Sequence, residues 1–222
     1  MFFRYSSYVL LFNFIYHYYD FFLWYLGDQP IQIEYAYYKG MYAFTSALIF
    51  IIYIHILFFP KNKLDTPRIP SFPPLIMLFS LNFGLFLGIH NLYIIQLYKL
   101  PEFLNYLRSI EIGSIFILSS FILIYFSMQS FKNHREDPNP TTKSNILITS
   151  GIFKYIRNPM YLALTLFQFG IGASLSFIHI CLMSFVTIVL LHYFIVKKEE
   201  KYLIDRFGSS YTTYLNSTRR WL

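Results

Sequence analysis

The sequence predicts an all-α, polytopic integral membrane bundle with four spanning helices, a C-terminal helical hairpin and a short interfacial helix at the C-terminus. Composition is the first reason. The 222 residues are 56% hydrophobic and 13% charged, with a mean hydropathy of +0.45, whereas about a quarter of the residues of a soluble domain are charged. The second reason is that apolar stretches recur near the length of about 20 residues that a helix needs to cross a bilayer.

Six apolar stretches account for the predicted helices; they cover residues 5–26, 41–59, 73–98, 109–131, 159–173 and 176–196. The first four are long enough to cross a membrane. The fifth has about 15 residues, roughly 22 Å of helix, and crosses only with tilt or local thinning of the bilayer. Because "GIGAS", residues 170–174, follows it and supplies a flexible turn, we expect the last two stretches to form one hairpin over residues 159–196.

Two of these stretches carry polar or small residues that call for an interpretation. In the first, Asn13, His17 and Asp20 follow helical spacing and share one face. Ionisable groups inside a membrane are costly and often functional, and the alternative is a His17–Asp20 pair that satisfies itself. In the third, Gly84 and Gly88 form a GxxxG motif, which indicates a notch for helix packing.

Basic residues predict the orientation of the bundle. With the N-terminus in the cytoplasm and every stretch crossing, all but three of the 18 lysine and arginine residues fall on the cytoplasmic side; the three are Lys39, Lys99 and Arg108. The longest polar loop, residues 131–151, also lies there. We therefore expect a multi-pass protein with both termini cytoplasmic and a tail anchored at the interface by Arg219, Arg220 and Trp221.

Several site classes are disfavoured by the sequence. Cys181 is the single cysteine, and the six histidines are scattered without an HxxxH or HExxH pair, so we expect no metal site. The net charge of +7 is explained by basic cytoplasmic loops, so we expect no nucleic-acid partner.

Charged and polar residues lie at both ends of the predicted hairpin. Arg157, Asn158 and Pro159 precede its outgoing arm, and Glu199 and Glu200 follow its returning arm. Asparagine is a good N-cap and proline suits the first helical turn. Because a hairpin returns to the face it left, these groups should meet and form a site with a cationic end for a carboxylate or phosphate and an anionic end for an ammonium or sulfonium. In the alternative interpretation, Arg157 pairs with one of the glutamates and simply closes the hairpin.

The surrounding motifs carry a family resemblance. "NILITSGIFKYIRNPMYLAL", the apolar hairpin and "EEKYLIDRFGSSYTTYLNSTRRWL" resemble the C-terminal half of the isoprenylcysteine carboxyl methyltransferase family and the related phospholipid methyltransferases, over residues 141–222. The positions that fit the family pattern are Leu147, Thr149, Ser150, Gly151, Arg157, Pro159, Tyr161, Glu199, Glu200, Leu203, Phe207, Gly208, Tyr211 and Tyr214. The resemblance implies a methyltransferase that uses S-adenosyl-L-methionine.

The same resemblance implies roles for individual residues. Ile146, Leu147 and Ile148 would line the nucleoside, Phe153 and Tyr161 would pack against the cofactor, and Asn158 and Pro159 would contact its amino-acid part. Glu199 would bind its amino group; Arg157, Asn158 and Glu200 are the expected catalytic residues. The chain departs from the family in two places. Asn158 stands where many members have histidine, and Ile195 stands where prenylcysteine enzymes have an arginine for the substrate carboxylate.

The expected acceptor is a lipid-like small molecule or a lipidated substrate. Methyl transfer from a sulfonium requires mainly proximity and alignment, and no motif residue is an obvious base, which favours an acceptor that needs none, such as the carboxylate of a prenylated compound. We expect residues 1–131 to form the acceptor pocket and residues 132–222 the cofactor-binding region. Two alternatives remain: an NADPH-dependent sterol or steroid reductase of related architecture, and a non-enzymatic membrane scaffold.

Overall fold

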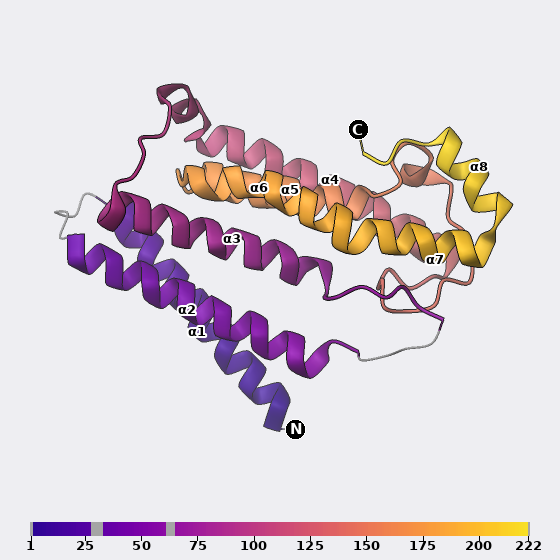
Figure 1. Ribbon diagram of the computed structural model, residues 1–222, viewed down its shortest axis with the longest axis horizontal. Coiled ribbons are helices and arrows are strands. Elements are labelled where there is room, and N and C mark those ends of the chain that lie inside the picture. Colours follow the sequence, from indigo (N-terminus) through magenta and orange to yellow (C-terminus); the bar gives the residue numbers. More distant parts are fainter. Residues whose placement is uncertain (1, 28–32, 61–64, 222) are drawn as a thin grey trace.

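The computed structural model describes residues 2–27, 33–60 and 65–221, all-helical apart from one isolated bridge between Ile156 and Arg219. Lys61 and Lys63, which the charge argument places in the cytoplasm, lie outside the described residues. The helices, labelled in Figure 1, are α1 (Phe2–Leu26), α2 (Ile33–Phe58), α3 (Pro73–His90), α4 (Ile110–His134), α5 (Pro159–Ser174), α6 (Ile178–Leu191), α7 (Lys197–Phe207) and α8 (Ser209–Ser217). The predicted all-α class is confirmed.

Four helical segments in the described part of the chain have the length and apolar composition to cross a membrane: Glu34–Phe58, Pro73–Ile95, Ile110–His134 and Ile178–Phe207. The last is one continuous helix of 30 residues that joins α6 to α7 through the π-helical turn His192–Val196. The set differs from the expected four spanning helices in two ways: α1 is absent from it, and Ile178–Phe207 is included. Helix α1 is not among the four, although it has 25 residues, because polar side chains such as Asn13, His17 and Asp20 interrupt its apolar sequence.

The turn of the hairpin lies later than expected. Helix α5 continues to Ser174, and Ser176 turns the chain with a left-handed φ of 56°. The glycines of "GIGAS" serve packing instead of turning. A Cβ on Gly170 would lie 2.8 Å from the carbonyl oxygen of Gly113 in α4, and a Cβ on Gly172 would lie 2.6 Å from the amide nitrogen of Cys181 in α6. Small residues at these points let α5 approach both neighbouring helices.

The GxxxG motif of α3 is a packing notch, as predicted. A Cβ on Gly84 would lie 3.0 Å from the carbonyl oxygen of His179, and one on Gly88 would lie within 2.5 Å of the Phe177 ring. Phe177 fills this notch together with Phe21 and Phe22 of α1. The notch therefore joins α3 to the start of α6.

The polar face of α1 is arranged differently from the expected self-contained pair. The Asp20 carboxylate forms an ion pair with the Lys39 ammonium of α2, and the His17 ring stacks on Tyr42, also of α2, at 5.7 Å between centroids. Of the two interpretations, the self-contained His17–Asp20 pair is therefore not the one present, because the Asp20 carboxylate pairs with the ammonium of Lys39 on the next helix. These contacts join α1 to α2.

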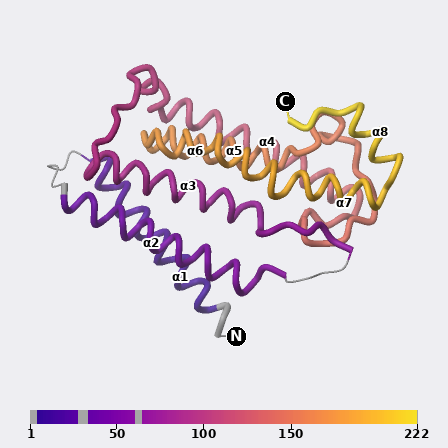
Figure 2. The backbone as a smooth tube through the Cα atoms, viewed as in Figure 1, coloured from indigo at the N-terminus to yellow at the C-terminus, as the bar shows by residue number. Residues whose placement is uncertain are grey.

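Polar and irregular segments gather at one end of the bundle. The loop between α4 and α5, the start of α5, and helices α7 and α8 lie together there (Figures 1 and 2). Helix α4 packs along α5, and α5 packs along α6, so the start of α5 and the end of α6 reach the same end. This arrangement brings together the two ends of the hairpin.

Candidate functional site

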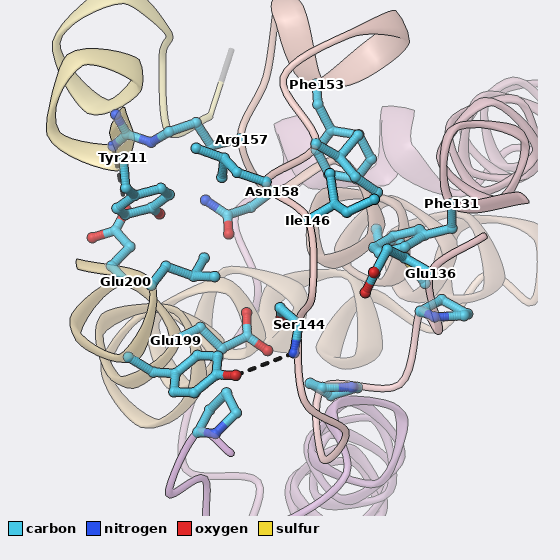
Figure 3. A pocket seen from close by; sticks show the side chains of 18 of the residues that line it. Phe131, Glu136, Ser144, Ile146, Phe153, Arg157, Asn158, Glu199, Glu200 and Tyr211 are labelled. Atoms are coloured by element: carbon cyan, nitrogen blue, oxygen red, sulfur yellow. Dashed lines mark hydrogen bonds and ion pairs between the residues drawn. The ribbon is translucent and has the colours of Figure 1, made fainter. Parts of the chain in front are cut away.

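A cavity opens at this end of the bundle, and all ten residues predicted for the site line it. It has about 950 Å³ of empty space, including its open mouth. The predicted residues in its wall are Ile146, Leu147, Ile148, Phe153, Arg157, Asn158, Pro159, Tyr161, Glu199 and Glu200. Figure 3 shows Arg157, Glu200 and Tyr211 on one side and Ile146, Phe153 and Phe131 on the other, with Asn158 between them.

The hairpin joins Tyr161, in the first turn of α5, to Glu199 of α7. The Tyr161 hydroxyl donates a hydrogen bond of 2.5 Å to Glu199 Oε1. Within the described part of the chain, no cation lies within ion-pair distance of Glu199. Glu199 is therefore an acid of the cavity wall that remains available to a cationic ligand.

The neighbouring acid, Glu200, has a different environment. Its Oε1 lies 3.3 Å from Nη2 of Arg157, and both of its oxygens accept hydrogen bonds from Arg220, at 2.9 and 2.8 Å. The side chains of Glu200 and Arg157 are only 12% and 9% exposed. Glu200 is thus held between two guanidinium groups, and of the two interpretations of Arg157 the ion pair that closes the hairpin is the one present.

Arg157 makes further contacts with the end of the chain. Its Nη1 donates to the carbonyl oxygens of Leu215, at 2.5 Å, and Thr218, at 2.8 Å. Its Nε is buried and has no hydrogen-bond partner. Buried donors are nearly always bonded, so this N–H is an unused donor beside the cavity.

Asn158 occupies the N-cap position of α5 without making the cap bond that we expected. Its Nδ2 instead donates a hydrogen bond of 3.1 Å to the carbonyl oxygen of Arg220. The backbone angles (φ −124°, ψ 53°) lie outside the usual extended range of a capping residue. Pro159 follows at the first helical position, as predicted. The amide of Asn158 therefore attaches the C-terminal segment to the cavity.

The wall opposite Glu199 and Glu200 is built from the end of α4 and the loop between α4 and α5. Phe153 and Ile148 are buried there, and the Phe131 and Phe153 rings meet edge to face at 5.5 Å. The loop is held by two contacts: the Ser144 amide donates to the Tyr202 hydroxyl at 3.1 Å, drawn as a dashed line in Figure 3, and the Tyr214 hydroxyl donates to the Phe153 carbonyl oxygen at 2.6 Å. This wall offers a flat apolar surface suited to an aromatic ring.

Sequence reasoning missed several residues of the site. Tyr211 and Tyr214 of α8 line the cavity; both belong to the recognised motif, but their side chains had no assigned role. Arg220, which we expected as an interfacial anchor, bonds Glu200 instead. Burial raises the pKa of Tyr214 to about 12 and raises that of Tyr211 further, so both phenols stay protonated at neutral pH. The hydrogen bond to Glu200 raises the pKa of Arg220, so its charge is permanent.

The N-terminal half contributes little to the wall of this cavity. Of its residues expected to form the acceptor pocket, Pro67 and Phe131 line the cavity. Below it, Ile69 packs in an apolar cluster with Leu191 and Ile195, against which Tyr161 also packs. Ile195, at the position of the family's substrate-binding arginine, is thus buried among apolar side chains. No group of three or more potential metal-ligating side chains occurs among the described residues.

The charges of the wall are strongly unequal. Four carboxylate side chains line the cavity: Glu136, Asp137, Glu199 and Glu200. The cation in the described lining is Arg157, which is already engaged by Glu200. With Glu200 neutralised, three acids remain that have no basic ion-pair partner among the described residues, so the described wall favours a positively charged ligand.

Comparisons with known proteins agree with this arrangement. Residues 109–210 match the phospholipid methyltransferase family. No curated protein and no solved structure matches the chain. The matched region runs from the start of α4 into α8 and contributes most of the cavity wall. The part of the chain that contributes most of the cavity wall is therefore similar to the phospholipid methyltransferase family, a family of membrane methyltransferases.

Proposed function

We propose that this protein transfers a methyl group from S-adenosyl-L-methionine to a lipid-like acceptor at the membrane surface. The observation that carries the proposal is the charge of the cavity wall: among the described residues, it has three acids without a basic ion-pair partner and one cation already engaged. S-adenosylmethionine presents an ammonium and a sulfonium, and both are suited to such a wall. The domain division proposed for the chain assigns cofactor binding to residues 132–222 and acceptor binding to residues 1–131.

The side chains present fit this cofactor. Glu199, oriented by the Tyr161 hydroxyl, would accept hydrogen bonds from the ammonium group. The apolar wall of Ile146, Leu147, Ile148 and Phe153 would hold the nucleoside. The carboxylate would find Asn158, Pro159 and the start of α5, with the unpartnered Nε–H of Arg157 nearby.

The catalytic demand on the protein is small. The cofactor, when bound, supplies an activated methyl group on a sulfonium whose leaving group is neutral. The chain then has to hold donor and acceptor in line and to exclude water. Three residues are proposed as catalytic: Arg157, Asn158 and Glu200. They would act by fixing the shape of the cavity, since Arg157 bonds Glu200 directly and Asn158 and Glu200 both bond Arg220. No proton transfer is assigned to Asn158, because an amide does not titrate.

The acceptor is proposed to be lipid-like, and its reacting group has two candidates. A carboxylate, as in prenylated substrates, needs no base. An amine headgroup is favoured by the acidic wall and by the apolar surroundings of Ile195, where a carboxylate would find no counter-charge. Membranes of stated composition, containing either a prenylcysteine or phosphatidylethanolamine, would be incubated with methyl-labelled donor. Label in the prenylcysteine alone would rule out the amine, and label in the phospholipid alone would rule out the carboxylate.

A direct binding experiment tests the proposed cofactor. We expect the purified protein in detergent to bind S-adenosylhomocysteine and not NADPH in calorimetry, because the 2′-phosphate and pyrophosphate of NADPH need cations that the described lining does not offer free. Tight NADPH binding would favour the reductase alternative. Absence of binding for both would favour a scaffold.

We also propose that both termini lie in the cytoplasm, on the basis of the distribution of basic residues. The family resemblance, in which asparagine at the position of Asn158 is a common bacterial variant, supports a bacterial inner membrane as the location. A cysteine introduced at the exposed Asn216 of α8 tests this orientation. We expect a membrane-impermeant maleimide to label Asn216→Cys only after the cells are permeabilised, because α8 would face the cytoplasm. Labelling of intact cells would reverse the proposed topology.

A further inference from the structure

Residues 218–221, near the C-terminus, form a strap that lies against the cavity-lining residues Arg157, Asn158 and Glu200. The Arg157 amide donates a hydrogen bond of 2.9 Å to the Arg219 carbonyl oxygen beside the Ile156–Arg219 bridge. One residue later, the Arg220 carbonyl oxygen accepts the bond from Asn158. The backbone of the strap therefore runs alongside the segment that leads into α5, and it is held at consecutive residues.

The side chain of Arg220 reaches α7. Its Nε and Nη2 form a two-point contact with the Glu200 carboxylate of α7. Arg220 thus joins three segments that are far apart in the sequence: its own strap, the start of α5 through its carbonyl oxygen, and α7 through its guanidinium. A paired geometry of this kind fixes orientation as well as charge.

This contact separates the roles of two adjacent acids. Glu200 carries two guanidinium partners, whereas Glu199 is bonded by the Tyr161 hydroxyl. If Glu200 lost one of its two guanidinium partners, it would compete with Glu199 for a cationic ligand. Because Glu200 is buried, losing a partner would also destabilise the folded protein. Arg220 is the more exposed of the two arginines, 36% against 9% for Arg157, so it is the contact that can open without dismantling the hairpin.

We propose that Arg220 is a positioning residue for the cofactor site: it fixes the strap against the cavity wall and holds Glu200 and Asn158, so that Glu199 is the acid presented to the cofactor. The proposal rests on the proposed function, because it concerns the binding of that cofactor. It assigns to the strap a role beyond anchoring in the membrane interface. It also makes Glu200 a partner of the strap instead of a direct ligand of the cofactor.

The experiment compares Arg220→Gln, Arg220→Lys and Arg219→Gln. Arg219 is the matched control, since it is adjacent and exposed and its side chain has no hydrogen bond or ion pair among those of the described residues. The probe is S-adenosylhomocysteine, titrated by calorimetry. We expect Arg220→Gln to weaken binding at least tenfold and Arg219→Gln to stay within twofold of the wild type. Arg220→Lys should recover only part of the loss, because it keeps the charge but not the two-point contact with Glu200.

A second readout follows the strap itself without ligand. The chain has two tryptophans, and Trp221 lies 6.4 Å from the His192 ring between centroids. In a Trp24→Phe background, Trp221 fluorescence reports whether the strap is docked. We expect iodide to quench it at least twofold more strongly in Arg220→Gln than in Arg219→Gln, with the unfolding temperatures of the two variants within 3 °C of each other, roughly the effect of 1 kcal/mol.

The outcomes separate the two proposals. If the wild type binds S-adenosylhomocysteine and Arg220→Gln binds it as well as Arg219→Gln does, the positioning role is refuted and the proposed function stands. If Arg220→Lys binds S-adenosylhomocysteine as weakly as Arg220→Gln does, while Trp221 stays protected from iodide in both variants, the role of the Arg220 charge is refuted. If the wild type binds no S-adenosylhomocysteine, the proposed function fails and the positioning role fails with it.

Discussion

Glu199→Gln is expected to weaken the binding of S-adenosylhomocysteine by at least tenfold, which corresponds to about 1.4 kcal/mol or more. Glutamine keeps the size of the side chain and an oxygen that can accept the bond from Tyr161, so the change removes mainly the negative charge. Hydrogen bonds to charged groups contribute about 1.5–3 kcal/mol, and Glu199 has no cation of its own among the described residues. Calorimetry on the protein in detergent measures the change.

The matched control for Glu199 is Asp205→Asn on the same helix. Asp205 lies in α7, is exposed, and does not line the cavity, so the same loss of charge should leave the affinity within twofold of the wild type. Equal effects of the two variants would show that Glu199 acts only through the general charge of the surface. A full loss of binding in both would point to a folding defect in α7 instead.

The contrast between Glu199 and Glu200 marks the limit of what the sequence predicts. Local signals predict the hairpin: an Asn-Pro start, an apolar run and an acid pair at its end. They also predict that it begins at Pro159 and that its two ends lie close together. Which acid meets Arg157 does not follow, because adjacent residues of a helix point about 100° apart. Their directions depend on the π-helical turn at His192–Val196, and this insertion has no signature in "HYFIV".

Two further differences have the same origin in long-range packing. "GIGAS" suggests a turn when only its neighbours in sequence are considered. The structure uses its glycines to let α5 approach Gly113 of α4, which is distant in sequence, and Cys181 of the following helix α6. The basic tail likewise suggests an interfacial anchor, yet Arg220 bonds a carboxylate 20 residues earlier. Local sequence signals thus predict where helices begin, whereas the contacts that a side chain makes across the bundle are set by the tertiary arrangement.

Arg157→Gln is expected to destabilise the protein by about 3 kcal/mol, at the lower end of the range for breaking a buried ion pair. The Arg157 guanidinium bonds two carbonyl oxygens, of Leu215 and Thr218, and the Glu200 carboxylate. Glutamine is too short to reach all three acceptors. The retained contact of Glu200 with Arg220 keeps the loss near this lower limit. For a protein of this size the unfolding temperature should fall by roughly 6–12 °C.

Thermal unfolding in detergent, followed together with S-adenosylhomocysteine binding, distinguishes the two interpretations of Arg157. If Arg157 acts as an ion pair that closes the hairpin, the Arg157→Gln variant should unfold at a temperature well below that of Arg219→Gln. Its affinity for S-adenosylhomocysteine should fall as well, because α8 and the strap detach from α5. As a direct contact to the ligand carboxylate, Arg157 would make the same variant lose affinity while melting with the control. The bonds to Leu215, Thr218 and Glu200 favour the first result, and an unchanged unfolding temperature would refute it.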